Sequence, residues 1–307
     1  MPKEGINKAV QPDYDTMSIE DVYSNDEKIM RDLVPTLDLG RTSTPRIPRP
    51  ARKSSWMDGY KGMNVSLQHS LSGPYGVQSR LALVEEIKNM ISYHVGNYTY
   101  YNDIPLAQRR HILRSFMFIK LKTKPDGSFD KVKARLVADG KHQDKALYDL
   151  IASAMVSLKG VFLLFNIASY YRAILASVDI TGAFLNAGFT AQDPTVRVLI
   201  DRITAAQWAK IDPTCTPYLT CKGELILTLD KFLYGLKQSP LKFQQHLAGA
   251  LKAGGYSQLK QDECLFIRRT KFGFCLLSTH DDDILIVSTC QSLIDELVSH
   301  LIAPIIR

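Results

Sequence analysis

The sequence has few of the features that mark secreted, disulfide-stapled or membrane proteins. Its 307 residues include only five cysteines, an odd number, and none is spaced with histidine as a zinc ligand would be. No run reaches the ~18 consecutive apolar residues of a membrane-spanning helix, and the first ten residues contain no apolar signal-peptide core. These absences argue against a membrane or secreted protein and predict a soluble chain in a reducing, intracellular compartment.

The composition is that of a basic globular protein. Hydrophobic residues make up 45% and charged residues 22%, which allows a sizeable core. The formal net charge of +7 is compatible with a polyanionic partner such as nucleic acid. Charge alone does not identify that partner, because many basic proteins bind no nucleic acid.

Residues 1–75 differ from the rest of the chain. Half of the 14 prolines fall there, together with the basic, serine-containing run of residues 42–55. This composition predicts a disordered N-terminal segment. Its basic run is interpreted either as a solvated linker or as a segment that steers nucleic acid or directs localisation. The folded domain is expected to occupy residues 76–307.

The first folded elements are predicted from periodicity. A helix is expected from Ser79 to the residue before Gly96, since apolar residues recur there at helical spacing. Residues 115–121 and 131–137 flank a Pro-Asp-Gly turn and predict two antiparallel strands. Alternation places Lys131, Lys133 and Arg135 on one face of the second strand.

The remaining elements complete an α+β pattern. Residues 153–170 are apolar nearly all round and predict a buried helix. Ser239 is expected to cap a later helix, with Pro240 in its first position. Further elements are a strand over 173–180, a strand over 225–229, strands over 274–278 and 284–288 around a polar turn, and a helix over 291–301. The order predicts an antiparallel sheet covered on one face by helices.

Carboxylates supply the first chemical signal. Asp281, Asp282 and Asp283 lie at the tip of an apolar hairpin, where they repel one another unless the turn is fully solvated or a cation binds there. Asp179 ends an apolar strand, where an unpaired charge is costly. If the two strands are neighbours, Asp179, Asp282 and Asp283 converge at one sheet edge and suit two divalent cations. The basic hairpin would then contact a triphosphate or template backbone, or it is simply a solvated basic strand.

Four segments carry a family resemblance: KARLVADG (133–140), VDITGAFLN (178–186), LYGLKQSP (233–240) and HDDDIL (280–285). Their order and spacing resemble those of copia-type LTR-retrotransposon reverse transcriptases, and LYGLKQSP is the specific element. The resemblance extends from about Arg80 to Leu301. It implies the fingers and palm of a right-hand polymerase, with the thumb missing and the chain truncated at its C-terminus.

The resemblance implies a role for each matching residue. Asp179, Asp282 and Asp283 correspond to the catalytic, metal-binding aspartates, and Ile180 would add a backbone carbonyl ligand. Phe184 matches the aromatic residue that selects deoxynucleotides; its alternative role is that of a core aromatic. The remaining expected nucleotide-binding residues are Lys133, Arg135, Tyr234, Gly235 and Lys237. A structural turn is a second interpretation of Gly235.

The implied activity is RNA-directed DNA synthesis. The cofactors would be two Mg²⁺ ions, for which Mn²⁺ can substitute, and the partners an RNA template, a DNA primer and deoxynucleoside triphosphates, with no membrane. Protease, integrase and RNase H parts of a retrotransposon polyprotein are missing. The family implies particles in the cytoplasm and later action in the nucleus.

Departures from the family pattern, together with the missing thumb, support a second hypothesis. Asp281 replaces an apolar residue of the family's turn, and His280 replaces a tyrosine. The alternative is therefore a catalytically inactive remnant that at most binds RNA or DNA. A third reading, an unrelated metal-binding protein, leaves LYGLKQSP unexplained.

Overall fold

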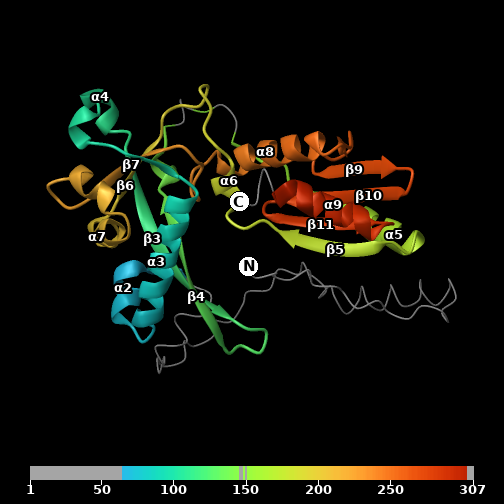
Figure 1. Ribbon diagram of the computed structural model, residues 1–307, viewed down its shortest axis with the longest axis horizontal. Helices are drawn as coiled ribbons and strands as arrows, with labels where there is room; N and C mark the ends of the chain where they lie inside the picture. Colours follow the sequence, from blue (N-terminus) through green and yellow to red (C-terminus); the bar gives the residue numbers. More distant parts are fainter. Residues whose placement is uncertain (1–63, 145–147, 149–150, 303–307) are drawn as a thin grey trace, which may run out of the picture. The chain divides into compact units, whose positions relative to one another are not determined.

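The structure is a computed structural model that describes residues 64–144, 148 and 151–302. The strands in these ranges form two sheets (Figure 1). One sheet has the order β1-β3-β6-β7-β2, with β4 also paired to β3. Its strands are β1 Asn64–Ser66, β2 Gly96–Tyr98, β3 Leu113–Thr123, β4 Phe129–Ala138, β6 Arg197–Ile200 and β7 Leu225–Leu229. The helices near it are α2 Leu67–Ser72, α3 Gly76–Ser92, α4 Leu106–Arg109 and α7 Arg202–Ile211.

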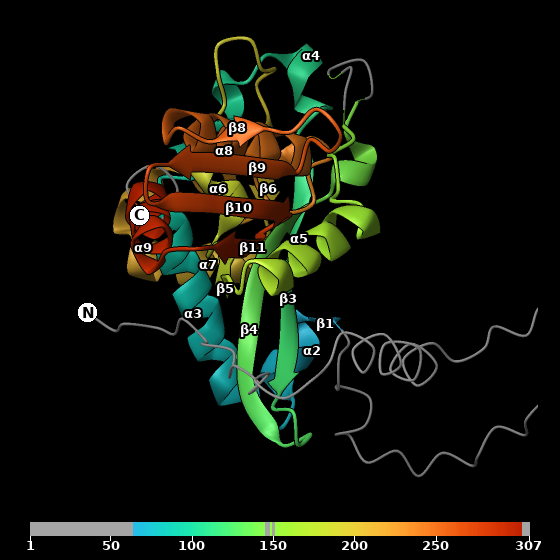
Figure 2. The same ribbon diagram turned by 90° about the vertical axis from the view of Figure 1, so that its right-hand side faces the viewer.

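The second sheet has the order β5-β11-β10-β9-β8, and all its neighbouring strands are antiparallel. Figure 2 shows these strands side by side in this order. They are β5 Ile174–Asp179, β8 Ser257–Gln258, β9 Leu265–Thr270, β10 Gly273–His280 and β11 Asp283–Ser288. The accompanying helices are α5 Leu158–Tyr170, α6 Ala183–Asn186, α8 Ser239–Ala253 and α9 Gln291–Ile302. The α+β class and its main hairpins are confirmed.

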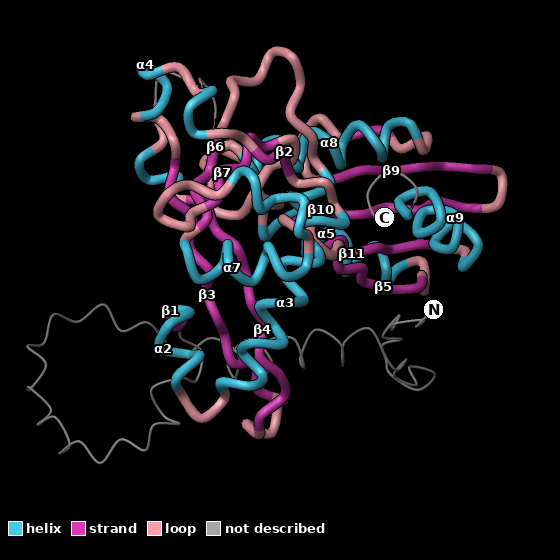
Figure 3. The backbone as a smooth tube through the Cα atoms, turned by 60° about the vertical axis from the view of Figure 1, so that its left-hand side comes forward, coloured by secondary structure: helices cyan, strands magenta, loops and turns pink. Residues whose placement is uncertain are grey.

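Strands β3 and β4 form a long two-stranded ribbon (Figure 3). Its exposed face contains the cross-strand pairs Lys120–Lys133 and Lys122–Lys131, followed by Phe118–Arg135. The prediction that alternate basic residues of β4 share one exposed face is confirmed. Like charges directly opposite each other destabilise a sheet, so the lysine pairs lower the stability of this ribbon.

Ordered structure begins earlier than the sequence suggested. Strand β1 pairs with β3, and the buried Ser70 hydroxyl of α2 lies 2.6 Å from the buried Ser79 hydroxyl of α3. The boundary after residue 75 is therefore wrong, because a short, partly polar segment is held by pairing to a strand distant in sequence. The predicted disorder of residues 1–63 concerns residues that the structure does not describe.

Helices cover both faces of the five-stranded sheet, not one. Leu276 and Val287 pack against α5, whereas their neighbours Leu277 and Ile286 belong to the core that includes α8 and α9. Residues 275–279 of β10 are all buried. The prediction of one covered face is wrong because a strand that is buried on both sides needs packing on both sides.

Helix α5 is not buried all round, although its composition predicted this. Leu164 is fully buried against the sheet, but Leu158 is 70% and Tyr170 82% exposed. The helix is shorter than the apolar run, beginning at Leu158, where the Ser157 side chain accepts a hydrogen bond from the Gly160 amide. A single helix on an outer face can bury only one side.

Helix α8 begins at Ser239, as predicted, but Ser239 is not its cap. The N-cap is Gln238, and the buried Ser239 hydroxyl donates to the Leu233 carbonyl at 2.6 Å. Ser239 thus ties the helix to the segment before it, because its side chain points back into the loop and not along the helix end. Pro240 lies in the first turn, as expected for a residue without an amide hydrogen.

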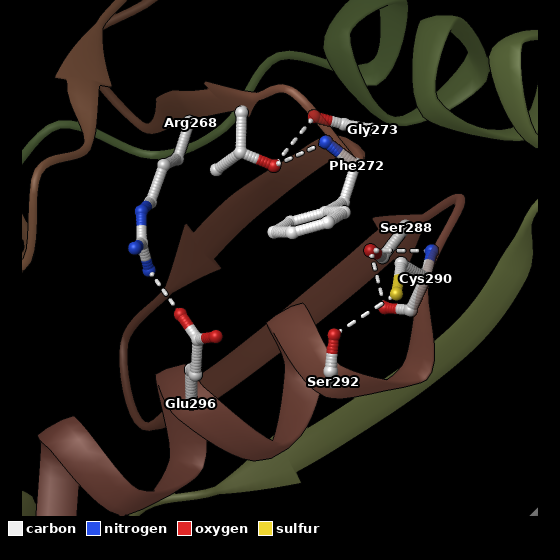
Figure 4. A network of polar contacts seen from close by, with 8 residues as sticks. Arg268, Phe272, Gly273, Ser288, Cys290, Ser292 and Glu296 are labelled. Carbon is white, nitrogen blue, oxygen red and sulfur yellow. Dashed lines mark hydrogen bonds and ion pairs between the residues drawn. The ribbon is translucent and has the colours of Figure 1, made fainter.

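Helix α9 is attached to the sheet by polar contacts (Figure 4). Arg268 of β9 and Glu296 of α9 form an ion pair at 3.0 Å. At the helix start, the Ser288 hydroxyl donates to the Cys290 carbonyl at 2.9 Å. These contacts join α9 to β9 and to the end of β11, the strand that begins with Asp283.

No described helix combines the length and apolar character needed to span a bilayer.

Two glycines allow the segment 231–238 to lie against the end of β4. The Ala138 amide donates to the Tyr234 carbonyl at 2.8 Å. Gly235 has φ +90°, and a Cβ there would lie 2.1 Å from the Ala138 carbonyl oxygen. A Cβ on Gly140 would lie 2.0 Å from the Gly235 carbonyl oxygen. Backbone meets backbone here, so neither position has room for a side chain.

Gly235→Ala is expected to lower the free energy of unfolding by about 2 kcal/mol or more, since it adds both a clash and an unfavourable backbone conformation. Urea unfolding followed by circular dichroism measures this change. Gly249→Ala in α8 is the matched control, because its Cβ meets no atom within 4 Å. That control should raise stability by up to about 1 kcal/mol. Equal effects of the two substitutions would contradict the close backbone contact.

Candidate functional site

The candidate site is built on the pairing of β5 with β11. In the register of these strands, Asp179, the last residue of β5, lies directly opposite Asp283, the first residue of β11. The Ile180 amide donates to the Asp282 carbonyl at 2.8 Å. Ile180 and Asp282 are therefore the hydrogen-bonded positions, and Asp179 and Asp283 form a non-hydrogen-bonded pair, in which side chains lie closest.

The turn between β10 and β11 contains only Asp281 and Asp282, because His280 already pairs with Asp283. This turn is shorter than the sequence suggested. Asp281 has φ +48°, a left-handed conformation that aspartate adopts more readily than most residues with a Cβ. The unusual Asp281 therefore has a local structural reason: it fits the first position of a tight hairpin turn.

The carboxylates influence each other. Partial desolvation, and then the negative charges of Asp282 and Asp179, raise the pKa of Asp283 above its ordinary value, against a smaller opposite effect of His280. Two carboxylates facing across a strand pair destabilise the sheet unless something positive lies between them. The electrostatics thus favour a cation at this edge.

The donor chemistry fits a hard divalent cation. Asp179, Asp282 and Asp283 offer carboxylate oxygens, the ligands that Mg²⁺ prefers. As the side chains stand, no three Asp, Glu, His or Cys residues in the described ranges converge closely enough to hold a metal ion. The strand pairing positions the backbones, and a metal site would require the carboxylates to turn toward one another.

An aromatic and cationic stack lies beside these carboxylates. The ring of Phe184 in α6 meets that of Tyr234 edge to face at 4.8 Å, and the Arg135 guanidinium lies 4.7 Å from the centre of the Tyr234 ring. Burial raises the pKa of Tyr234; Arg135 acts against this, and Asp282 and other nearby carboxylates add to it. Predicted residues from three distant segments therefore form one cluster.

Lys133 and Lys237 take different positions relative to this cluster. Partial desolvation and the positive charges of Arg135 and Lys122 lower the pKa of Lys133, while the charge of Asp179 acts in the opposite direction. Lys133 thus lies within electrostatic reach of the carboxylates. The Lys237 ammonium instead lies 5.6 Å from the centre of the Tyr148 ring. Gly235 contributes a backbone contact, as described above.

One residue of the cluster was missed from the sequence. Glu86 in α3 is only 9% exposed, and its Oε1 accepts a hydrogen bond from the Leu136 amide at 2.9 Å. Its carboxylate interacts with Lys133 and Arg135. A signal was present, because Glu86 lies at helical spacing from Leu83 on the apolar stripe, where an acidic residue is unusual.

Comparison with known proteins decides the family. Residues 100–304 match the family described as reverse transcriptase (RNA-dependent DNA polymerase). The chain belongs to the reverse transcriptase family. The copia-type resemblance of the four sequence segments is thereby confirmed.

Curated relatives of this reverse transcriptase chain are transposon polyproteins. It is 27% identical over 238 residues to the retrovirus-related Pol polyprotein from transposon TNT 1-94 of Nicotiana tabacum, covering 77% of the chain and 16% of that polyprotein. It is 26% identical over 212 residues to the one from transposon RE1 of Arabidopsis thaliana, covering 69% of the chain and 13% of the polyprotein. The chain therefore spans less than a fifth of the length of these relatives.

Asp283→Asn is expected to raise the free energy of unfolding of the metal-free protein at neutral pH, because it removes one of the facing charges. A raised pKa means that the folded chain binds more protons than the unfolded chain just above the ordinary carboxyl pKa. Wild-type stability should therefore fall as pH rises through that interval, and the variant should lack this fall. Urea unfolding with EDTA at about pH 4 and about pH 7 measures the difference.

Asp193→Asn supplies a control of opposite sign. The Asp193 carboxylate lies 2.5 Å from the Lys242 ammonium. Although burial acts in the other direction, hydrogen bonds from Lys242 and Thr190 lower the pKa of Asp193, so its charge stabilises the fold at neutral pH. This variant should lose stability at about pH 7. An Asp283→Asn protein with the wild-type pH dependence would refute the electrostatic argument.

Proposed function

We propose that this chain is the RNA-directed DNA polymerase portion of a copia-type retrotransposon polyprotein. It adds deoxynucleotides to the 3′-hydroxyl of a DNA primer on an RNA template. The observation that carries this proposal is the direct pairing of Asp179 with Asp283, with Asp282 in the adjoining turn. Facing carboxylates cost stability, and their cost is offset when they bind divalent cations.

Each part of the cluster has a role in this reaction. In the proposed assignment, the five-stranded sheet is the palm and the β3–β4 ribbon belongs to the fingers. Asp179, Asp282 and Asp283 would hold two divalent cations, and the Ile180 carbonyl would be an additional ligand. Mg²⁺ bound there, or Mn²⁺ in its place, would supply Lewis-acid activation of the primer hydroxyl and neutralise charge on the leaving pyrophosphate.

The basic and aromatic residues bind the incoming nucleotide. Lys133 and Arg135 project from the exposed face of β4 and neutralise the triphosphate. Tyr234 orients Arg135 through its ring, and Phe184, packed on Tyr234, limits the space beside the sugar. Gly235 lets this segment approach β4, and Lys237 supplies a further positive charge to the template or nucleotide.

Primer extension on poly(rA)/oligo(dT) with Mg²⁺ or Mn²⁺ tests the reaction. Wild-type protein should extend the primer, whereas Asp179→Asn and Asp282→Asn should each reduce the rate by at least about a hundredfold, since each removes a metal ligand. Asp103→Asn, which alters an exposed carboxylate outside the cluster, should leave it unchanged. Template binding without extension by the wild type would support the inactive remnant.

Phe184→Val tests sugar selection separately. Shortening this side chain should lower the preference for dTTP over UTP by roughly tenfold or more, because pocket shape alone discriminates ligands that differ by one small group. The ratio of kcat/KM values for the two nucleotides is the readout. Phe232→Leu is the control, because it also replaces a phenylalanine by a smaller apolar residue. The Phe232 ring is buried, stacks on Phe189 and lies outside the cluster. An unchanged ratio in Phe184→Val would assign Phe184 to the core alone.

A further inference from the structure

Strand β4 has an outer edge that no strand covers in the described part of the chain near Leu136. The Leu136 and Ala138 amides both point away from β3. Ala138 donates to the Tyr234 carbonyl at 2.8 Å, and Leu136 donates to the Glu86 carboxylate at 2.9 Å. A side chain of α3 therefore occupies the place of a neighbouring strand, immediately beside the position where the Tyr234 segment attaches.

Glu86 is costly to place there. It is 9% exposed, and burial raises its pKa, while the Leu136 amide and the charges of Lys133 and Arg135 act in the opposite direction. A buried carboxylate without partners would destabilise the fold. An apolar residue at this position would continue the stripe of Leu83 and Ile87, so packing alone gives no reason for glutamate.

The contacts place Glu86 between the core and the nucleotide-binding cluster. Arg135 directly precedes Leu136 and projects to the opposite face of β4, where its guanidinium lies over Tyr234. A hydrogen bond to a strand amide restrains the backbone on both sides of it. The hydrogen bond to the Leu136 amide thus also restrains the backbone of Arg135 and the direction in which its side chain projects.

We propose that Glu86 is a positioning residue of the nucleotide site: its carboxylate holds the outer edge of β4, so that Lys133 and Arg135 keep their places beside Tyr234 and the incoming triphosphate. The role for the triphosphate rests on the proposed function. The edge contact itself does not, and it can be tested in a protein that has no activity.

Hydrogen exchange measures the edge contact. In Glu86→Ala, the Leu136 amide should exchange at least about tenfold faster than in the wild type, because it loses a charged acceptor. Glu86→Gln retains an acceptor oxygen and should restore most of the protection. Glu85→Ala, which removes the neighbouring exposed carboxylate of the same helix, should not change it. Unchanged exchange in Glu86→Ala, or equal exchange in the Ala and Gln variants, would overturn the proposal.

Side-chain position is measured next. Modification of Arg135 by phenylglyoxal, quantified by mass spectrometry, should be several-fold faster in Glu86→Ala than in Glu85→Ala if the stack on Tyr234 loosens. Arg269 of β9, remote from Glu86 in sequence and in another sheet, serves as an internal reference. Faster modification of both arginines would indicate general unfolding and would overturn the positioning role.

Nucleotide binding gives the functional readout. With a dideoxy-terminated primer on poly(rA), dTTP and Mg²⁺ should stabilise the wild-type complex against a heparin challenge. Glu86→Ala should need about tenfold more dTTP, with affinity for the template-primer nearly unchanged. Unchanged dTTP dependence would overturn the role in the nucleotide site. If the wild type itself shows no dTTP effect, the proposed function fails, while exchange and modification still decide whether Glu86 holds Arg135.

Discussion

The antiparallel pairing of β5 with β11 is the constraint on which the candidate site depends. It places Asp179 opposite Asp283, although about a hundred residues separate them in the chain. A shift of one residue would move one carboxylate to the other face of the sheet. The buried residues that follow, Ile284 and Ile286, belong to the large core and so oppose such a shift. Packing of the core therefore keeps two mutually repelling charges together.

The local elements could be predicted because their patterns are local. The periodicity of α3, the alternation of β3 and β4 and the Ser-Pro start of α8 depend on neighbours only a few residues away. The covering of both faces of the five-stranded sheet was missed, although the unbroken apolar run from Cys275 to Leu277 indicated it. Ser239 was misjudged because its hydroxyl could bond either along the helix end or back to the loop, and only the loop conformation decides.

The site was predicted in part. The four segments that resemble the family marked the aspartates, Phe184 and Tyr234, and the family is confirmed. The physical argument alone could state only that Asp179 and the aspartate turn would converge if their strands were neighbours. Glu86 lay outside these segments, and recognising it required the distance from its carboxylate to the Leu136 amide. Long-range hydrogen bonds of this kind produce only a weak pattern in the sequence.

The opposed lysine pairs of the β3–β4 ribbon make its stiffness depend on its surroundings. Lys120 faces Lys133 and Lys122 faces Lys131, so repulsion across the ribbon weakens as salt increases and the Debye length shortens. A bound polyanion would relieve the same repulsion. Salt therefore has two opposing effects. It screens the repulsion between the lysines and so stiffens the ribbon when no polyanion is bound. It also weakens the binding of a polyanion, which would stiffen the ribbon in the same way. The ribbon is most pliable in dilute buffer without a polyanion, where its two strands are held mainly by backbone hydrogen bonds and by the apolar residues on its other face.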